Sequence, residues 1–294
     1  MEDLEREIDR ASNKLDPATF CRVFRLARER AWLEPKTEAV AELWNLCNSD
    51  DERNLVEDLI KRFRCITTAE FDSIGQQTAE SICVVWDLSP SGTLIVATSD
   101  TADADGSQAF IQSIKNKFVD FGDWTEANFC NGMSPSLDKL GDCKSIVLVD
   151  DFIGTGKQIS KRVAWYREKL GEGGLGAVVK LYVIAAAGME ISKQALNSLG
   201  VAYFCPVWLK KGISDHYSGA DLDQALTNMN SLEARLEPTV QKKSLSIYSF
   251  GYNKSETLFA IEPFNVPNNV FPIFWWPQVR VLTRRKTLFK RLAD

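Results

Sequence analysis

Apolar residues in the first part of the chain recur three or four positions apart, which is the period of an amphipathic helix. Asp16 followed by Pro17 suits a helix start, because Asp caps helix N-termini and Pro is tolerated at the first helical position. No strand-like run occurs before Gly75. The pattern predicts four helices, at residues 2–15, 17–32, 36–47 and 51–63. We expect residues 1–66 to form a helical region that either packs on a later domain or serves as an interaction region.

From about residue 67 onward, short continuous apolar runs alternate with helical periods. The apolar runs predict strands at residues 93–98, 145–149, 178–187 and 201–206. The helical periods lie at residues 67–86, 107–118, 157–170, 191–199 and 221–236. Apolar strands separated by helices are typical of a parallel sheet. The sequence therefore predicts an α/β domain at residues 67–294, with a mostly parallel sheet, helices on both faces and an irregular aromatic segment from Lys242.

Composition and charge narrow the class of protein. The 294 residues are 45% hydrophobic and 26% charged, as in globular proteins, and the length suits one large domain or two modest ones. The net charge of −5 argues against a general attraction to nucleic acid. The sequence has neither the ~18–20 consecutive apolar residues of a membrane span nor an apolar signal-peptide core. We therefore expect a cytoplasmic protein without a membrane partner.

The cysteines and the single histidine offer little metal chemistry. The seven cysteines are scattered without a C-x-x-C spacing, which excludes zinc sites of the Cys/His ribbon type. We expect ordinary thiols in a reducing compartment. His216 is either a general base or, as is more typical of a lone histidine, a structural residue.

The strongest chemical signal is the segment SIVLVDDFIGTGKQ at residues 145–158. Two adjacent acids, Asp150 and Asp151, follow an apolar strand, and a small-residue turn then opens a helix. Ligands of open α/β sheets bind beyond the carboxyl ends of strands, and a helix N-terminus suits a phosphate. The acids are suited to hold sugar hydroxyls, directly or through Mg²⁺. Gln158 and Ile159 stand where a Walker A loop and a dinucleotide fingerprint need other residues, so both motifs fail.

The sequence VLVDDFIGTG resembles the phosphoribosyl pyrophosphate signature of type I phosphoribosyltransferases. The resemblance implies that Asp150 and Asp151 contact the ribose hydroxyls, bind Mg²⁺ and serve in catalysis. It also implies a ligand-binding loop around the 5′-phosphate. The loop residues are Phe152, Ile153, Gly154, Thr155, Gly156, Lys157 and Gln158. Many members end this loop in Gly-Gly-Thr, so here a hydroxyl ligand is lost and Lys157 becomes a candidate phosphate ligand.

An acidic segment stands where the family has its pyrophosphate loop. Asp100, Asp103 and Asp105 follow the strand predicted at residues 93–98. These carboxylates would repel a pyrophosphate unless Mg²⁺ lies between them. The alternative is a solvated acidic loop with turn chemistry at Asp105-Gly106. This departure bears on transferase turnover more than on ribose-phosphate binding.

The run FNVPNNVFPIFWW at residues 264–276 resembles the late segment of phosphoribosyltransferase-like proteins from bacterial conflict systems. Genes of that branch neighbour reverse transcriptases and other antiphage components, including some retrons, which implies a defence effector. The alternative is a capped turn at Asn268-Asn269 and tryptophans that fill the core. Two basic clusters are either solvated faces or contacts to nucleic acid phosphates. Their residues are Arg22, Arg25, Arg28 and Arg30, and Arg280, Arg284, Arg285, Lys286, Lys290 and Arg291.

Two functions follow from these observations. In the first, the protein binds phosphoribosyl pyrophosphate or a nucleotide with Mg²⁺ and acts as a toxic antiphage effector. Its reaction would be glycosidic transfer or hydrolysis through an oxocarbenium-like transition state. In the second, the same pocket is a nucleotide-sensing module held by a defence-system partner, such as a reverse transcriptase with its DNA–RNA product.

Overall fold

The computed structural model describes residues 17–99, 105–262, 264–281 and 283–291. The helix expected at residues 2–15 lies outside the described residues, as do Asp16, Asp100 and Asp103. No helix of the described ranges is both long enough and apolar enough to cross a membrane.

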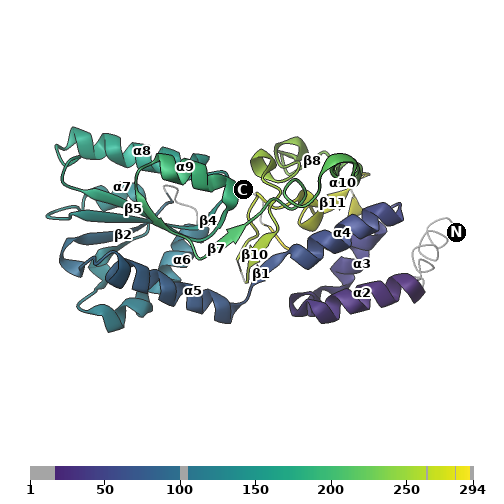
Figure 1. Cartoon of the computed structure of the whole chain (residues 1–294), viewed down its shortest axis with the longest axis horizontal. Helices are drawn as coiled ribbons and strands as arrows, with labels where there is room; N and C mark the ends of the chain where they lie inside the picture. Colours follow the sequence, from purple (N-terminus) through teal and green to yellow (C-terminus); the bar gives the residue numbers. More distant parts are fainter. Residues whose placement is uncertain (1–16, 100–104, 263, 282, 292–294) are drawn as a thin grey trace.

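A parallel sheet forms the centre of one half of the molecule (Figure 1). Its strand order is β3-β2-β4-β5-β6, and β7 also pairs with β5. All these pairings are parallel, as predicted. The strands are β2 (Thr93–Ala97), β3 (Phe129–Cys130), β4 (Ser145–Ile153), β5 (Lys180–Met189), β6 (Ala202–Phe204) and β7 (Val207–Leu209).

Helices cover both faces of this sheet, which confirms the predicted α/β architecture (Figure 1). Alternate residues of a strand point to opposite faces. Val147 and Val149 accordingly pack on the side of α5 (Thr68–Glu80) and α6 (Gly106–Ile114). Ile146 and Leu148 pack on the opposite side. That side carries α7 (Met133–Leu137), α8 (Lys157–Glu172) and α9 (Lys193–Ser198).

The N-terminal helices build a second hydrophobic core away from the sheet. They are α2 (Pro17–Glu29), α3 (Thr37–Asn45) and α4 (Asp50–Arg62), with a 3₁₀ helix (Ala31–Lys36) after α2. Their buried side chains share one cluster with α10 (Gly219–Glu233) and with apolar residues of the segment 250–289. The first and last parts of the described chain therefore pack together, as Figure 1 shows.

Two short strands join the two halves and correct one expectation. The sequence shows no strand-like run before Gly75, yet β1 (Arg64–Ile66) pairs in parallel with β10 (Phe259–Ile261). A strand of three residues carries no recognisable alternation, so its partner almost 200 positions later decides its conformation. The sequence also missed β3 and β7, for the same reason of length.

The C-terminal segment is mostly irregular, as expected, but it contains small paired strands. These are β8 (Thr239–Val240) with β9 (Lys243–Ser244), and β11 (Gln278–Val279) with β12 (Thr283–Arg284). Trp275 and Trp276 are buried, and their indole N–H groups donate to the carbonyl oxygens of Val270 and Glu237, each over 2.9 Å. The tryptophans therefore fill the core.

Candidate functional site

The two adjacent acids lie within β4 rather than beyond it. We expected the strand to end at Val149, but its ladder continues to Ile153, where it still pairs with β5. The alternation of a strand sends the two side chains to opposite faces of the sheet. Asp150 therefore faces α8, whereas Asp151 faces the start of α6.

Asp150 is held by a cation from α8. Its Oδ2 lies 2.9 Å from Nη1 of Arg162, and its Oδ1 accepts a hydrogen bond from the backbone N–H of Asp151 over 3.1 Å. The residue is only 8% exposed. Burial raises the pKa of Asp150, the Arg162 charge opposes that rise, and the Asp105 carboxylate adds to it.

Asp151 has no cationic side chain paired with it among the described residues. Burial raises its pKa well above the usual range, and the nearby charges of Asp150 and Asp105 raise it further. The carboxyl lies directly against Gly106, where any Cβ would overlap with it. Asp105 itself caps α6, since its Oδ1 accepts from the backbone N–H of Gln108 over 3.1 Å. A cation or a set of hydroxyl donors supplied by a ligand would therefore favour the ionised form of Asp151.

The turn after β4 is shaped by glycine. Gly156 has φ +80°, a left-handed conformation that side-chain-bearing residues rarely adopt, and a Cβ there would lie 2.8 Å from Cβ of Ala195. α8 starts at the next residue and runs for 16 residues, so its unpaired first-turn N–H groups face the turn. Such a helix N-terminus favours an anion.

Two adjoining cavities collect the residues that the sequence singled out. The acid cavity, of about 380 Å³, contains Asp150 and Asp151. The loop cavity, of about 550 Å³, is lined by Ile153, Gly154, Thr155, Gly156 and Lys157. Both cavities share Asp150, Phe152, Gln158, Asn268 and Asn269. The structure thus brings all nine candidate residues together, while ligand binding by them stays a prediction.

The late segment of the chain completes both cavities. Asn269 donates from Nδ2 to Oγ of Ser255 over 3.2 Å and to the carbonyl oxygen of Tyr252 over 3.3 Å. Its amide lies so close to Gly154 that a Cβ on that glycine would overlap with it. Asn268-Asn269 follows a turn, since the backbone N–H of Val270 donates to the Pro267 carbonyl oxygen over 3.1 Å. The structure therefore contains both the turn at Asn268-Asn269 and a contact between Asn269 and the loop that follows β4.

Sequence reasoning missed two cations of the acid cavity. Arg162 follows Gln158 by four positions on α8, so helical spacing already placed it on the same face. Arg291 also lines the acid cavity, although the sequence suggested it only as part of a basic cluster. Its position depends on the packing of the chain's last described residue against Val266, whose carbonyl oxygen accepts from Nη1 over 2.6 Å.

Other candidates lie elsewhere. His216 lines neither cavity, and burial together with the charges of Arg62 and Lys210 lowers its pKa. The seven cysteines are free thiols. Within the described ranges, no group of three or more His, Cys, Asp or Glu residues is arranged to hold a metal ion.

Comparison with known proteins adds one strong match. A family model described as PRTase-CE matches residues 44–291. No curated protein matches the chain. One solved structure that resembles it is a hypothetical protein from Neisseria gonorrhoeae with bound ppGpp, at 10% identity and a TM-score of 0.33. That match covers 55% of this chain and 94% of the other, and its TM-score is too low for any transfer of function.

Proposed function

Because the chain belongs to the PRTase-CE family, which is phosphoribosyltransferase-like, we propose that the acid and loop cavities together bind a ribose-5-phosphate ligand. The observation that supports this proposal most directly is their shared wall. Asp150 belongs to that wall, Asp151 lines the acid cavity, and the glycine turn with the N-terminus of α8 lines the loop cavity. A ribose held by the carboxylates would direct its 5′-phosphate to the turn and to Lys157.

The residues present fit a magnesium ion that is shared with the ligand. Asp150 is already compensated by Arg162, whereas Asp151 is buried beside two carboxylates and has no paired cation among the described side chains. Mg²⁺ prefers one or two carboxylates together with water and ligand oxygens. Bound there, the ion would supply charge compensation between the carboxylates and an anionic ligand.

The reaction proposed for this site is glycosidic transfer or hydrolysis at the anomeric carbon. The chain's contribution would be positioning: the carboxylates fix the ribose hydroxyls, and the first turn of α8 fixes the phosphate. Holding both ends of a sugar in one orientation removes much of the entropic part of a barrier. Asp150, oriented by Arg162, and Asp151 are the proposed catalytic residues.

A nucleotide-sensing module is the second candidate, and Asp105 favours it. In the resembling family this part of the chain binds pyrophosphate, yet here a carboxylate caps α6 and raises the pKa of Asp151. A site that repels the leaving group is better suited to retain a ligand than to turn it over. Such a module would act through a defence-system partner, whereas the enzyme would be a toxic effector in antiphage defence.

Calorimetric titration tests the proposal. Phosphoribosyl pyrophosphate and AMP are titrated separately, with and without Mg²⁺, into the full chain, and products are then sought by chromatography. Binding should require Mg²⁺ and should be lost in Asp150→Asn/Asp151→Asn. Asp221→Asn/Asp223→Asn, on the exposed face of α10, removes the same charge and should bind normally. Absence of binding by the folded wild-type protein would refute the site. Binding with product formation favours the enzyme, and binding without it favours the module.

A further inference from the structure

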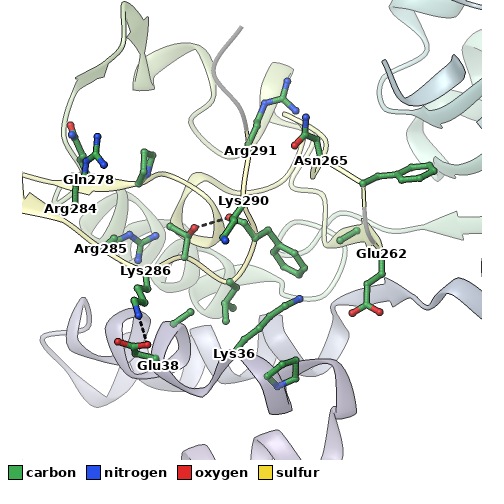
Figure 2. A pocket seen from close by; sticks show the side chains of 18 of the residues that line it. Lys36, Glu38, Glu262, Asn265, Gln278, Arg284, Arg285, Lys286, Lys290 and Arg291 are labelled. Atoms are coloured by element: carbon green, nitrogen blue, oxygen red, sulfur yellow. Dashed lines mark hydrogen bonds and ion pairs between the residues drawn. The ribbon is translucent and has the colours of Figure 1, made fainter. Parts of the chain in front are cut away.

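A large basic cavity lies between the N-terminal helices and the C-terminal segment (Figure 2). Its volume is about 1310 Å³, and among the described residues six cationic and two acidic side chains line it, in a chain whose net charge is −5. The acidic residues are Glu38 and Glu262. The cationic residues are Lys36, Arg284, Arg285, Lys286, Lys290 and Arg291.

Arg285 is a buried charge without a carboxylate partner among the described residues. It is 9% exposed, and its Nε donates to the Trp276 carbonyl oxygen over 3.0 Å and its Nη2 to that of Ile273. No acceptor in the described chain meets Nη1. Burial lowers the pKa of Arg285 to about 10, so the group stays charged at neutral pH. The Glu42 charge opposes the effect of burial but forms no ion pair with Arg285, and an external anion would offset the remaining cost of the buried charge.

The opposite wall also carries cations. Lys36 is half-buried, with its Nζ 4.5 Å from the ring centre of Phe289 and 5.1 Å from that of Trp32. Lys286 is paired with Glu38, so it contributes less positive charge at its end of the cavity. Arg284 and Lys290 are exposed at the cavity's edge. Positive charge therefore lies on two walls and at the opening, which suits several phosphates better than one.

The size and the surroundings of the basic cavity indicate the kind of ligand. Its volume exceeds the ~300–1,000 Å³ of pockets that hold small molecules. It shares Phe264, Asn265 and Arg291 with the acid cavity, so the two cavities adjoin at these residues. Figure 2 shows Asn265 and Arg291 together at one end. Single-stranded nucleic acids are commonly bound in a basic groove that follows the phosphate backbone and that carries aromatic side chains on which bases stack.

We infer that the basic cavity binds the phosphate backbone of a single-stranded nucleic acid and that the strand passes Arg291 beside the acid cavity. This binding does not depend on whether the acid cavity accepts a ribose phosphate. The inference therefore goes beyond the proposed function, and the two can fail separately.

Fluorescence anisotropy with a 5′-fluorescein-labelled 12-nucleotide oligodeoxythymidine, and with the matching oligouridine, tests the inference over a series of KCl concentrations. With three or four phosphates contacted, the slope of log K against log salt should be about −2 to −3, at roughly 0.7 per phosphate. Arg284→Ala/Lys290→Ala, which changes exposed side chains, should weaken binding at least tenfold and flatten the slope by about 1.4.

Two controls make the result specific. Arg25→Ala/Arg28→Ala removes the same charge from the exposed face of α2 and should bind within about twofold of wild type. Asp150→Asn/Asp151→Asn should also keep its oligonucleotide affinity, even where it loses the ribose phosphate. The inference is overturned by no oligonucleotide binding at low salt, or by an equal loss in the α2 variant. Displacement of the labelled oligonucleotide from Asp150→Asn/Asp151→Asn by ATP or tripolyphosphate, at concentrations no higher than those of unlabelled oligonucleotide, would also overturn it, because a compact polyphosphate would then be the ligand.

Discussion

Glu52 is the charged side chain that ties α4 to the end of α10, and its removal is the sharpest test of how the N-terminal helices are held. The residue is 4% exposed. Its Oε1 and Oε2 lie 2.7 and 2.8 Å from Nη2 and Nη1 of Arg235, and Oε2 also accepts from the backbone N–H of Asn48 over 2.6 Å. Burial by itself raises the pKa of Glu52, but the hydrogen bonds from Arg235 and Asn48 outweigh it and lower the pKa.

The expected cost of Glu52→Ala follows from what the substitution leaves behind. Breaking a buried ion pair costs about 3–5 kcal/mol, because the remaining charge stays without a partner. The Arg235 side chain is 27% exposed, so water compensates part of that loss and the lower end, about 3 kcal/mol, applies. At roughly 2–4 °C per kcal/mol for a chain of this size, the melting temperature should fall by on the order of 6–12 °C.

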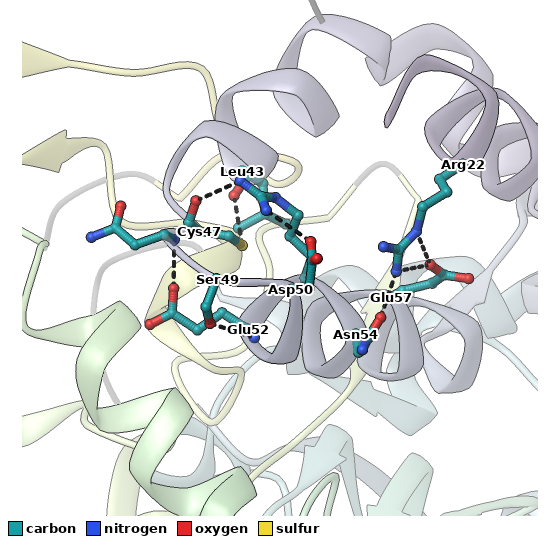
Figure 3. Close-up of polar contacts among 10 residues, drawn as sticks. Arg22, Leu43, Cys47, Ser49, Asp50, Glu52, Asn54 and Glu57 are labelled. Carbon is teal, nitrogen blue, oxygen red and sulfur yellow. Dashed lines mark hydrogen bonds and ion pairs between the residues drawn. The ribbon is translucent and has the colours of Figure 1, made fainter. Parts of the chain in front are cut away.

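The same helix provides a matched control, since Glu57 also pairs with an arginine (Figure 3). Its Oε2 lies 2.8 Å from Nη2 of Arg22, but the Glu57 side chain is 17% exposed, against 5% for that of Glu52, and Lys61 offers a second cation. Pairs of this kind contribute about 0–1 kcal/mol. Glu57→Ala should therefore shift the melting temperature by only a few degrees.

Urea unfolding followed by circular dichroism measures both variants, and Arg235→Ala closes a double-mutant cycle with Glu52→Ala. A coupling energy of about 2 kcal/mol or more is expected. Because the folded pKa of Glu52 is lowered, its contribution is present above the unfolded pKa and is lost as the pH falls through the folded value. The difference between wild type and Glu52→Gln should thus persist at pH 7 and shrink in acid. Equal losses for the Glu52 and Glu57 variants would refute the reasoning.

Three further predictions follow from the site and from α4. Asp151→Asn should stabilise the fold increasingly as the pH rises above about 4, since burial raises the pKa of Asp151 and its ionisation therefore opposes folding; equal melting temperatures from pH 3 to 8 would contradict this. Gly154→Ala should weaken phosphoribosyl pyrophosphate binding about tenfold or more by displacing Asn269, and added Asn269→Ala should restore part of it in the same titration. Ser49→Ala should cost about 1 kcal/mol in urea unfolding, because Oγ caps α4 by accepting from the Glu52 N–H over 3.2 Å (Figure 3), and an unchanged midpoint would exclude the cap.

The parts of the fold that the sequence predicted are those with a local pattern. The long strands β4 and β5 are continuous apolar runs, and α8 and α10 repeat their apolar residues with a helical period. β1 and β10 have three residues each, so their pairing comes from the packing of both halves and leaves no periodic signal. The extension of β4 through its two acids was missed because charged residues normally end an apolar run.

The same distinction applies to the candidate site. Asp150, Asp151 and the glycine turn belong to one contiguous motif, so the sequence already placed them together. The spacing of four positions between Gln158 and Arg162 could have indicated that both lie on the same face of α8. Asn269 and Arg291 enter the site through contacts between segments more than 100 positions apart, and local patterns do not encode such contacts.

The charges around the acid cavity restrict how a ribose phosphate can lie there. Arg162 is already ion-paired with Asp150, and Asp105 adds a further negative charge beside Asp151. A phosphate next to Asp151 would therefore need a divalent cation between the two groups. A phosphate at the first turn of α8 needs none, because that helix end is positive. The ribose is thus expected between the carboxylates and the turn, with its phosphate toward Gly156 and any further phosphates toward Arg291 and the basic cavity.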